Sequence, residues 1–77
     1  MASVKFSKDD PEWIVLNEFW QLLQKHWQPE DTETYWNIVI NEVNAFGTQE
    51  PRLLRRNLAS ALINIFEARY KEMKKNA

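Results

Sequence analysis

The chain has 77 residues, of which 44% are hydrophobic and 27% charged, with a formal net charge of −1 and no cysteine. The absence of cysteine excludes disulfides, thiolate metal sites and cysteine nucleophiles, and it suits a reducing compartment. No apolar run approaches the roughly 18 residues that span a bilayer, and residues 1–10 lack a signal-peptide pattern, so we expect one small soluble domain in the cytoplasm without membrane contact.

Residues 1–9 precede the first helix signal and are predicted to form a flexible N-terminal arm. They contain no apolar segment long enough to pair stably, because an isolated short strand is marginal in water. Residues 10–77 are predicted to form a single domain.

The first helix is predicted to begin at Asp10 and to end before Pro29. Asp10 is placed to cap a free backbone N–H, Pro11 suits the first helical position, and the residue before a proline avoids the helical region. The side chains predicted to face the core recur at spacings of three and four: Trp13, Leu16, Trp20, Leu23 and Trp27. A second set widens this apolar face: Val15, Phe19 and Leu22.

The second helix is predicted to run from Asp31 or Thr32 to Phe46, with Gly47, the only glycine, in a left-handed cap. Its apolar face contains Trp36, Val39, Val43 and Phe46, flanked by Tyr35 and Ile40. The β-branched residues of this segment would also suit a strand, but the helical spacing, the acidic start and the glycine favour a helix.

The third helix is predicted to open between Thr48 and Pro51 and to run to about Lys74. Its buried face contains Leu54, Leu58, Ala61, Leu62, Ile65 and Phe66. Because the connections are short, successive helices should pack antiparallel. The predicted fold is all-α, a three-helix bundle with short loops.

Charge is divided unevenly along the chain. Residues 1–50 contain nine acids and three lysines, whereas residues 51–77 contain seven basic residues and two acids. This asymmetry indicates either that the third helix packs against two acidic helices or that it presents a basic binding face.

Three arginines stand in the first turns of the third helix, where they oppose the macrodipole. We expect Arg55 to pair across the bundle with an acid, one of Glu30, Asp31, Glu33 and Glu42. Two roles remain open for Arg52 and Arg56: they pair with acids inside the bundle, or they form an anion or phosphate site at the helix N-terminus.

Four tryptophans on two helices cannot all be covered in so small a domain, and an exposed aromatic patch is typical of an interface. We therefore expect Trp13 and Trp20, together with Arg52 and Arg56, to bind a partner. A homodimer through the first helix is the simplest way to cover the excess aromatic surface.

The inventory of reactive side chains argues against an enzyme. The chain has one histidine, His26, and a single glycine, so it lacks a Gly-rich phosphate loop. The acidic clusters at residues 9–12 and 30–33 lie at predicted helix starts, where capping and the macrodipole already explain them. The sequence predicts no catalytic residue, no metal site and no cofactor.

Four segments of the chain carry a family resemblance: Phe19-Trp20, His26–Trp36, Glu42–Phe46 and Arg56–Leu62. Together they resemble small phage-encoded proteins of Firmicutes, in which a Phe-Trp pair precedes a proline-led acidic turn, a Tyr-Trp pair opens the next helix and a basic helix follows. The resemblance covers residues 12–70 and includes no catalytic signature. It implies a phage origin, and because small accessory phage proteins often bind host or defence proteins, it favours an inhibitor-like role.

The function predicted from these observations is a non-enzymatic protein–protein interaction module, a phage accessory or anti-defence protein that binds a host or defence protein. One alternative is a nucleic-acid-binding protein whose third helix contacts phosphates through Arg52, Arg56, Lys71, Lys74 and Lys75. The isoelectric point of about 5.8 and the missing helix-turn-helix pattern disfavour it. The other alternative is a structural protein that self-associates.

Overall fold

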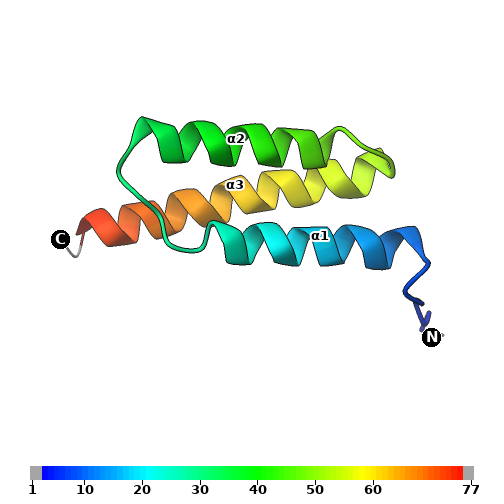
Figure 1. Cartoon of the computed structure of the whole chain (residues 1–77). Helices are drawn as coiled ribbons and strands as arrows, with labels where there is room; N and C mark the ends of the chain where they lie inside the picture. The colour runs from blue at the N-terminus through cyan, green and yellow to red at the C-terminus, as the bar shows by residue number, and fades with distance from the viewer. Residues whose placement is uncertain (1–2, 76–77) are drawn as a thin grey trace.

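The computed structural model describes residues 3–75, which form three α-helices joined by short loops (Figure 1). The helices are α1 (Pro11–Lys25), α2 (Glu33–Gly47) and α3 (Arg52–Lys75). No strand occurs among residues 3–75. The prediction of an all-α three-helix bundle is therefore confirmed. Residues 1–2 of the predicted arm and residues 76–77 of the predicted domain lie outside the described residues.

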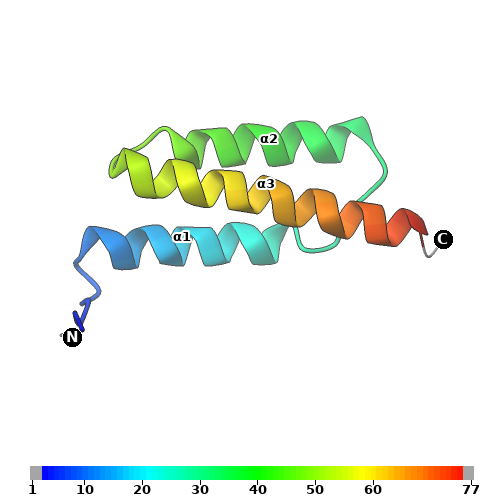
Figure 2. The same cartoon turned by 180° about the vertical axis from the view of Figure 1, so that it is seen from behind.

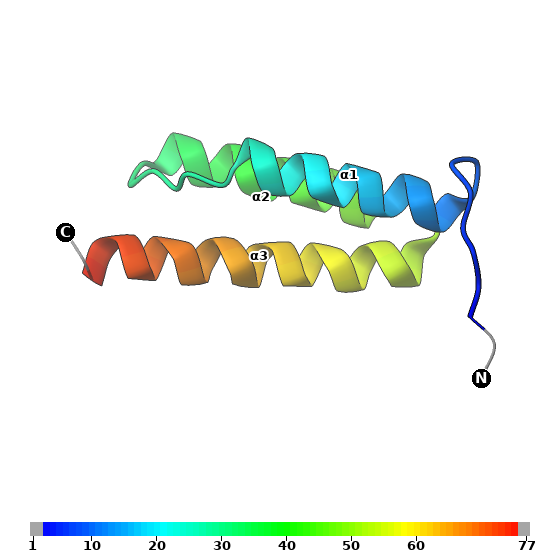
Figure 3. The ribbon, with the colours of Figure 1, turned by 90° about the horizontal axis from the view of Figure 1, so that it is seen from below.

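The three helices alternate in direction, as expected for short connections: α1 and α3 run the same way and α2 runs against both (Figure 1). Seen from the front and from behind, α3 lies between the other two helices (Figures 1 and 2). Seen from below, α3 lies on one side of α1 and α2 together (Figure 3). The axes thus form a triangle in cross-section. The α2–α3 interface is the most extensive and the α1–α2 interface the least, so α1 is the least enclosed helix.

Side-chain hydrogen bonds mark the start of two helices. The predicted start of α2 at Asp31 or Thr32 is confirmed: Thr32 caps the helix, because its Oγ1 accepts a hydrogen bond from the backbone N–H of Tyr35 at 3.1 Å. Asp10 occupies the N-cap position of α1, but the predicted bond to the helix is not formed. Its Oδ2 instead accepts the backbone N–H of Ser7 at 2.8 Å, which closes a turn between residues 3–9 and α1.

The end of α1 differs from the prediction. The helix ends at Lys25 with His26 as its C-cap, and does not continue to Pro29. The carbonyl oxygens of His26 and Trp27 accept hydrogen bonds from the Tyr35 hydroxyl at 2.8 Å and from Arg69 Nε at 2.7 Å. The backbone leaves the helix here because side chains of α2 and α3 satisfy these two carbonyl groups.

The predicted left-handed cap at Gly47 is wrong. None of the described residues has a positive φ, and Gly47 is the last residue of α2. Its role is close approach between helices, because a Cβ atom at this position would lie 3.0 Å from the Cβ of Ala59 on α3.

Gly47→Ala is therefore expected to destabilise the fold by about 1–2 kcal/mol, although alanine is the better helix former. The Cβ of Ala59 is fixed to the α3 backbone and cannot rotate away, so α2 and α3 must move apart. Urea denaturation of the single variants and of the double variant Gly47→Ala/Ala59→Gly measures the coupling. If Gly47→Ala cost the same in the Ala59→Gly background, the close approach would not be its cause.

The hydrophobic core is small and is drawn mainly from α2 and α3. Its buried members are Val15, Tyr35, Val39, Val43, Phe46, Leu62 and Phe66. The faces predicted for α2 and α3 are largely confirmed, with Trp36 half-buried and Ile40 exposed. The helix α1 contributes one fully buried residue, Val15, and half-buried Phe19, Leu22 and Leu23 beside it.

Half of the core face predicted for α1 is wrong: Val15, Phe19, Leu22 and Leu23 face the core, whereas Trp13, Leu16, Trp20 and Trp27 do not. Of the two apolar sets on α1, the one with Val15, Phe19 and Leu22 faces the core, and the tryptophans lie about 100° further round the helix. Both sets have helical spacing, so periodicity alone does not choose between them. The solvent-accessible surface of 5959 Å² exceeds the roughly 5,000 Å² expected for a compact chain of this mass, and the exposed tryptophans contribute to the excess.

Candidate functional site

A row of apolar side chains that we call the outer stripe follows the outward side of α1 and continues just past its end: Trp13, Leu16, Trp20, Leu23 and Trp27. The exposed fractions are 38% for Trp13, 49% for Leu16, 55% for Trp20 and 40% for Trp27. The structure thus leaves three of the four tryptophans partly exposed. Their helical spacing had assigned them to the core, but the expectation that so small a domain cannot cover all four is confirmed.

The spacing within the outer stripe is that of a coiled-coil seam. The five residues alternate between steps of three and four, which is the spacing of the a and d positions of a heptad repeat. The side of α1 with Val15 and Phe19, about 100° away, already packs on the core of its own bundle. The helix therefore has a second apolar face, whose side chains residues 3–75 leave partly exposed apart from half-buried Leu23.

A groove of about 260 Å³ lies within the outer stripe. It is lined by Trp20, Leu23, Gln24 and Trp27, which stand at positions i, i+3, i+4 and i+7. On a continuous helix, four residues at this spacing form the hole that receives one side chain of a facing helix in knobs-into-holes packing. Here Trp20, Leu23 and Gln24 lie on α1, and Trp27 closes the groove from just past the end of the helix. The shape of the groove therefore suits the side chain of another helix.

Arg69 of α3 fixes the far end of the outer stripe. Its guanidinium carbon lies 3.7 Å from the centre of the Trp27 ring, and its Nε donates to the Trp27 carbonyl oxygen at 2.7 Å. The ring is thereby held although Trp27 lies two residues past the end of α1. No ion pair of Arg69 occurs among residues 3–75, so its charge is free to meet an acid from outside.

The four residues predicted to bind a partner lie on two separate surfaces. Trp13 and Trp20 belong to the outer stripe. Arg52 is exposed at the start of α3, and its Nε lies 3.8 Å from Glu50 Oε1. Arg56 lines a different groove, between α2 and α3. The structure does not bring the tryptophans and these arginines together.

His26 is buried where the three helices meet, and its ring packs edge-on against Tyr35 and Phe66 with centroids 6.2 and 6.0 Å away. Its Nε2 lies 3.1 Å from Glu42 Oε1, and Lys25 Nζ donates to Glu42 Oε2 at 3.0 Å. Partial burial raises the pKa of the Glu42 carboxyl, but the hydrogen bonds from Lys25 and His26 outweigh it and leave that pKa below its usual value.

The lowered pKa of Glu42 predicts a loss of stability in acid. A carboxyl group with a pKa lower in the folded chain than the ordinary 4.5 contributes stability above that pH, and this contribution disappears as the pH falls through the folded value. Denaturation by urea between about pH 7 and pH 3 should show a smaller loss for Glu42→Gln than for the native chain. An unchanged pH dependence in Glu42→Gln would contradict the assignment.

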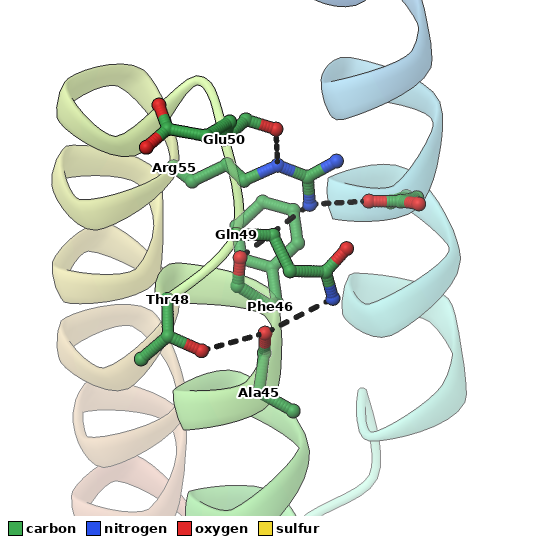
Figure 4. Close-up of polar contacts among 7 residues, drawn as sticks. Ala45, Phe46, Thr48, Gln49, Glu50 and Arg55 are labelled. Atoms are coloured by element: carbon green, nitrogen blue, oxygen red, sulfur yellow. Dashed lines mark hydrogen bonds and ion pairs between the residues drawn. The ribbon is translucent and has the colours of Figure 1, made fainter.

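Arg55 is buried between α1 and the start of α3, with 4% of its surface exposed. Its Nε donates to the Glu50 carbonyl oxygen at 2.9 Å, and one terminal nitrogen donates to the Phe46 carbonyl oxygen at 3.4 Å (Figure 4). The same nitrogen pairs with Glu18 Oε2 at 2.5 Å. The prediction of a cross-bundle pair is confirmed, but its partner is Glu18 of α1.

The turn after α2 is held by bonds from its own side chains. Thr48 Oγ1 and Gln49 Nε2 both donate to the Ala45 carbonyl oxygen, at 3.2 and 3.1 Å (Figure 4). These bonds satisfy a carbonyl group at the open end of α2. They place Glu50 so that its own carbonyl oxygen reaches Arg55.

Asp31 joins the loop between α1 and α2 to the last turns of α3. The Tyr70 hydroxyl donates to its Oδ1 at 2.6 Å, and Lys74 Nζ lies 3.1 Å from its Oδ2. The hydrogen bond from Tyr70, and then that from Lys74, lowers the pKa of Asp31. Two basic residues of α3 therefore pair with acids of the first half of the chain: Arg55 with Glu18 and Lys74 with Asp31. Arg56 makes no ion pair within residues 3–75.

Residues 3–75 contain no group of three or more His, Asp or Glu side chains that could hold a metal ion. Within the same span, no helix combines the length and the apolar character needed to cross a bilayer. No protein-family model, curated protein or solved structure matches the chain.

Proposed function

We propose that this protein is a non-enzymatic protein–protein interaction module, and that its outer stripe binds a helix of another protein chain. The observation that carries the proposal is that α1 has two apolar faces, one packed on the core and one at the surface. Its inner face fills the core, while the outer stripe repeats the a and d spacing of a helix-pairing seam at the surface.

The groove within the outer stripe supports a helix as the bound element. A mostly apolar groove lined by three residues of α1 and by Trp27 just past its end accepts a single side chain, and a facing helix offers such side chains at matching intervals. Exposed tryptophan is also the residue type that most often dominates binding energy at protein interfaces.

The polar side chains best placed for chemistry support a non-enzymatic role. His26 is bound to Glu42, and Arg55 is bound to Glu18, so these groups stabilise contacts between helices. Each pair joins two elements of the bundle, which is a sufficient structural reason for its presence.

No observation favours the nucleic-acid alternative. Arg55 is buried, Lys74 pairs with Asp31, and Arg52 lies near Glu50. The remaining basic residues of α3 divide between its two ends, because Arg56 and Lys71 are fifteen residues apart, which is about 22 Å along the helix. They do not form one continuous phosphate-binding face.

Site-specific photocrosslinking tests the proposed function. A benzophenone amino acid is placed at Trp20 and, as a control, at Leu53, which is apolar and 68% exposed but lies outside the outer stripe. In bacterial cells that produce the chain, the probe at Trp20 should form a covalent adduct of discrete mass with a protein chain, and the probe at Leu53 should not. The absence of an adduct at Trp20, or equal adducts at both sites, would overturn the proposal.

A further inference from the structure

The outer stripe is arranged so that it can pair with itself. Its central residue is Trp20, with Trp13 and Trp27 seven residues away on either side. If two copies of α1 cross antiparallel about a two-fold axis at Trp20, Trp13 of each copy faces Trp27 of the other. Each exposed tryptophan then meets a tryptophan, and the same surface serves both partners, as a two-fold interface requires.

Charge favours the antiparallel orientation. Asp9, Asp10 and Glu12 stand at the start of α1, next to Lys8. At the Trp27 end of the outer stripe, Arg69 provides a positive charge that makes no ion pair within residues 3–75, beside the acidic cluster at residues 30–33. Parallel pairing would bring the acidic ends of the two copies together. Antiparallel pairing places the acidic end of each copy beside Arg69 of the other.

Glu12 lies at this end of the outer stripe and is half-buried. One of its carboxylate oxygens is enclosed by its own bundle without a hydrogen-bond partner within residues 3–75, so that oxygen is closed to a second chain. The negative charge of the residue is what antiparallel pairing brings near Arg69 of a second copy.

These observations lead us to infer that the helix bound by the outer stripe is α1 of a second copy of this chain, in antiparallel orientation. The inference rests on the proposed function, because it names the partner of the same surface.

The size of the outer stripe sets the expected affinity. Its exposed side chains present roughly 400 Å² of apolar surface, taking about 250 Å² for a whole tryptophan. Two facing stripes thus bury roughly 800 Å² before flanking residues are counted, against about 1,200 Å² at the lower end for specific complexes. The dimer should therefore dissociate in the micromolar range.

Sedimentation equilibrium across about 1–300 µM, a range that brackets the expected dissociation constant, tests the inference on the full chain. The native chain should pass from monomer to dimer. Trp20→Gln should weaken the dimer at least tenfold while far-UV circular dichroism stays unchanged. Leu16→Gln provides a second disruption of the outer stripe if Trp20→Gln loses helicity. Leu53→Gln, outside the stripe, should leave the dimer unchanged.

Charge reversal tests the orientation and the contact between copies. Glu12→Lys and Arg69→Glu should each weaken self-association several-fold, because each places like charges together twice. An equimolar mixture of the two variants should regain dimer formation to within about threefold of the native chain, since the mixed dimer contains two opposite-charge pairs. A purely structural role of either residue would not be rescued by mixing.

Three results would overturn the inference. A native chain that stays monomeric to about 300 µM excludes the second copy as partner, and a crosslink from Trp20 to a different protein would then leave the proposed function standing. A dimer insensitive to both Trp20→Gln and Leu16→Gln uses another surface. A dimer that Glu12→Lys does not weaken is not antiparallel.

Discussion

Replacement of Arg55 by alanine is expected to lower the free energy of unfolding by about 3 kcal/mol. The guanidinium group is almost completely buried and is the hydrogen-bond donor to Glu18 and to two backbone carbonyl groups. Removing it leaves these acceptors without their partner and opens a cavity at the junction of α1, α2 and α3. Urea denaturation followed by far-UV circular dichroism measures the loss.

Arg52 provides the matched control, since it is the same residue type on the same helix but exposed. Arg52→Ala should change the free energy of unfolding by less than about 0.5 kcal/mol, because a solvent-exposed pair with Glu50 contributes little. Equal effects of the two substitutions would mean that the Arg55 network does not hold the helices together.

Phe66→Ala is expected to remove about 3–5 kcal/mol. Phe66 is completely buried, and its ring packs against the buried ring of His26 at 6.0 Å between centroids. A chain of this length has a total stability of only about 0.05–0.15 kcal/mol per residue, so the variant should lose a large share of its free energy of unfolding. Circular dichroism measures the helicity of Phe66→Ala. Phe66→Leu removes fewer atoms, so its smaller loss of free energy of unfolding can be measured by urea titration.

Leu53→Ala is the control for Phe66, because Leu53 lies on the same helix but is mostly exposed. Its effect should stay within about 0.5 kcal/mol. If Phe66→Ala folded with nearly native stability, the core assigned to the meeting of the three helices would be wrong.

The number of helices and their connections could be predicted from local signals. Thr32 stands directly before α2, and the prolines and the single glycine separate the apolar segments, so the helices fall close to where they were expected. The end of α1 could not be predicted, because it depends on hydrogen bonds from Tyr35 and Arg69, which are distant in sequence. The role of Gly47 could not be predicted for the same reason, because it depends on contact with Ala59, which belongs to another helix.

Periodicity could not predict which apolar face of α1 packs on the core. Two apolar sets with helical spacing compete, and the larger tryptophans make the outer stripe the stronger signal in a sequence that contains no information on the partner. Because a seam for pairing with a second chain has the same spacing as a core seam, the two are indistinguishable until the fold shows which is covered. The expectation that some of the tryptophans stay exposed is nonetheless confirmed for Trp13 and Trp20.

The sequence predicted that Arg55 forms an ion pair across the bundle, but it did not identify the partner. The arginines at the start of α3 oppose the macrodipole, which correctly marked Arg55 for pairing across the bundle. Its partner Glu18 was not among the acids considered, and the contact of His26 with Glu42 was missed. Both pairs depend on how α1 is rotated about its axis, which was the part of the fold that the sequence left open.

The stability of Trp20→Gln as a monomer tests the central claim most directly, namely that the outer stripe is a binding surface and not part of the core. Urea denaturation at about 1 µM protein keeps the contribution of any dimer small. The free energy of unfolding should fall by less than about 1 kcal/mol, with an unchanged cooperative transition. A loss of about 3 kcal/mol or more, comparable to that of Phe66→Ala, would show that Trp20 holds the fold together and would contradict the account.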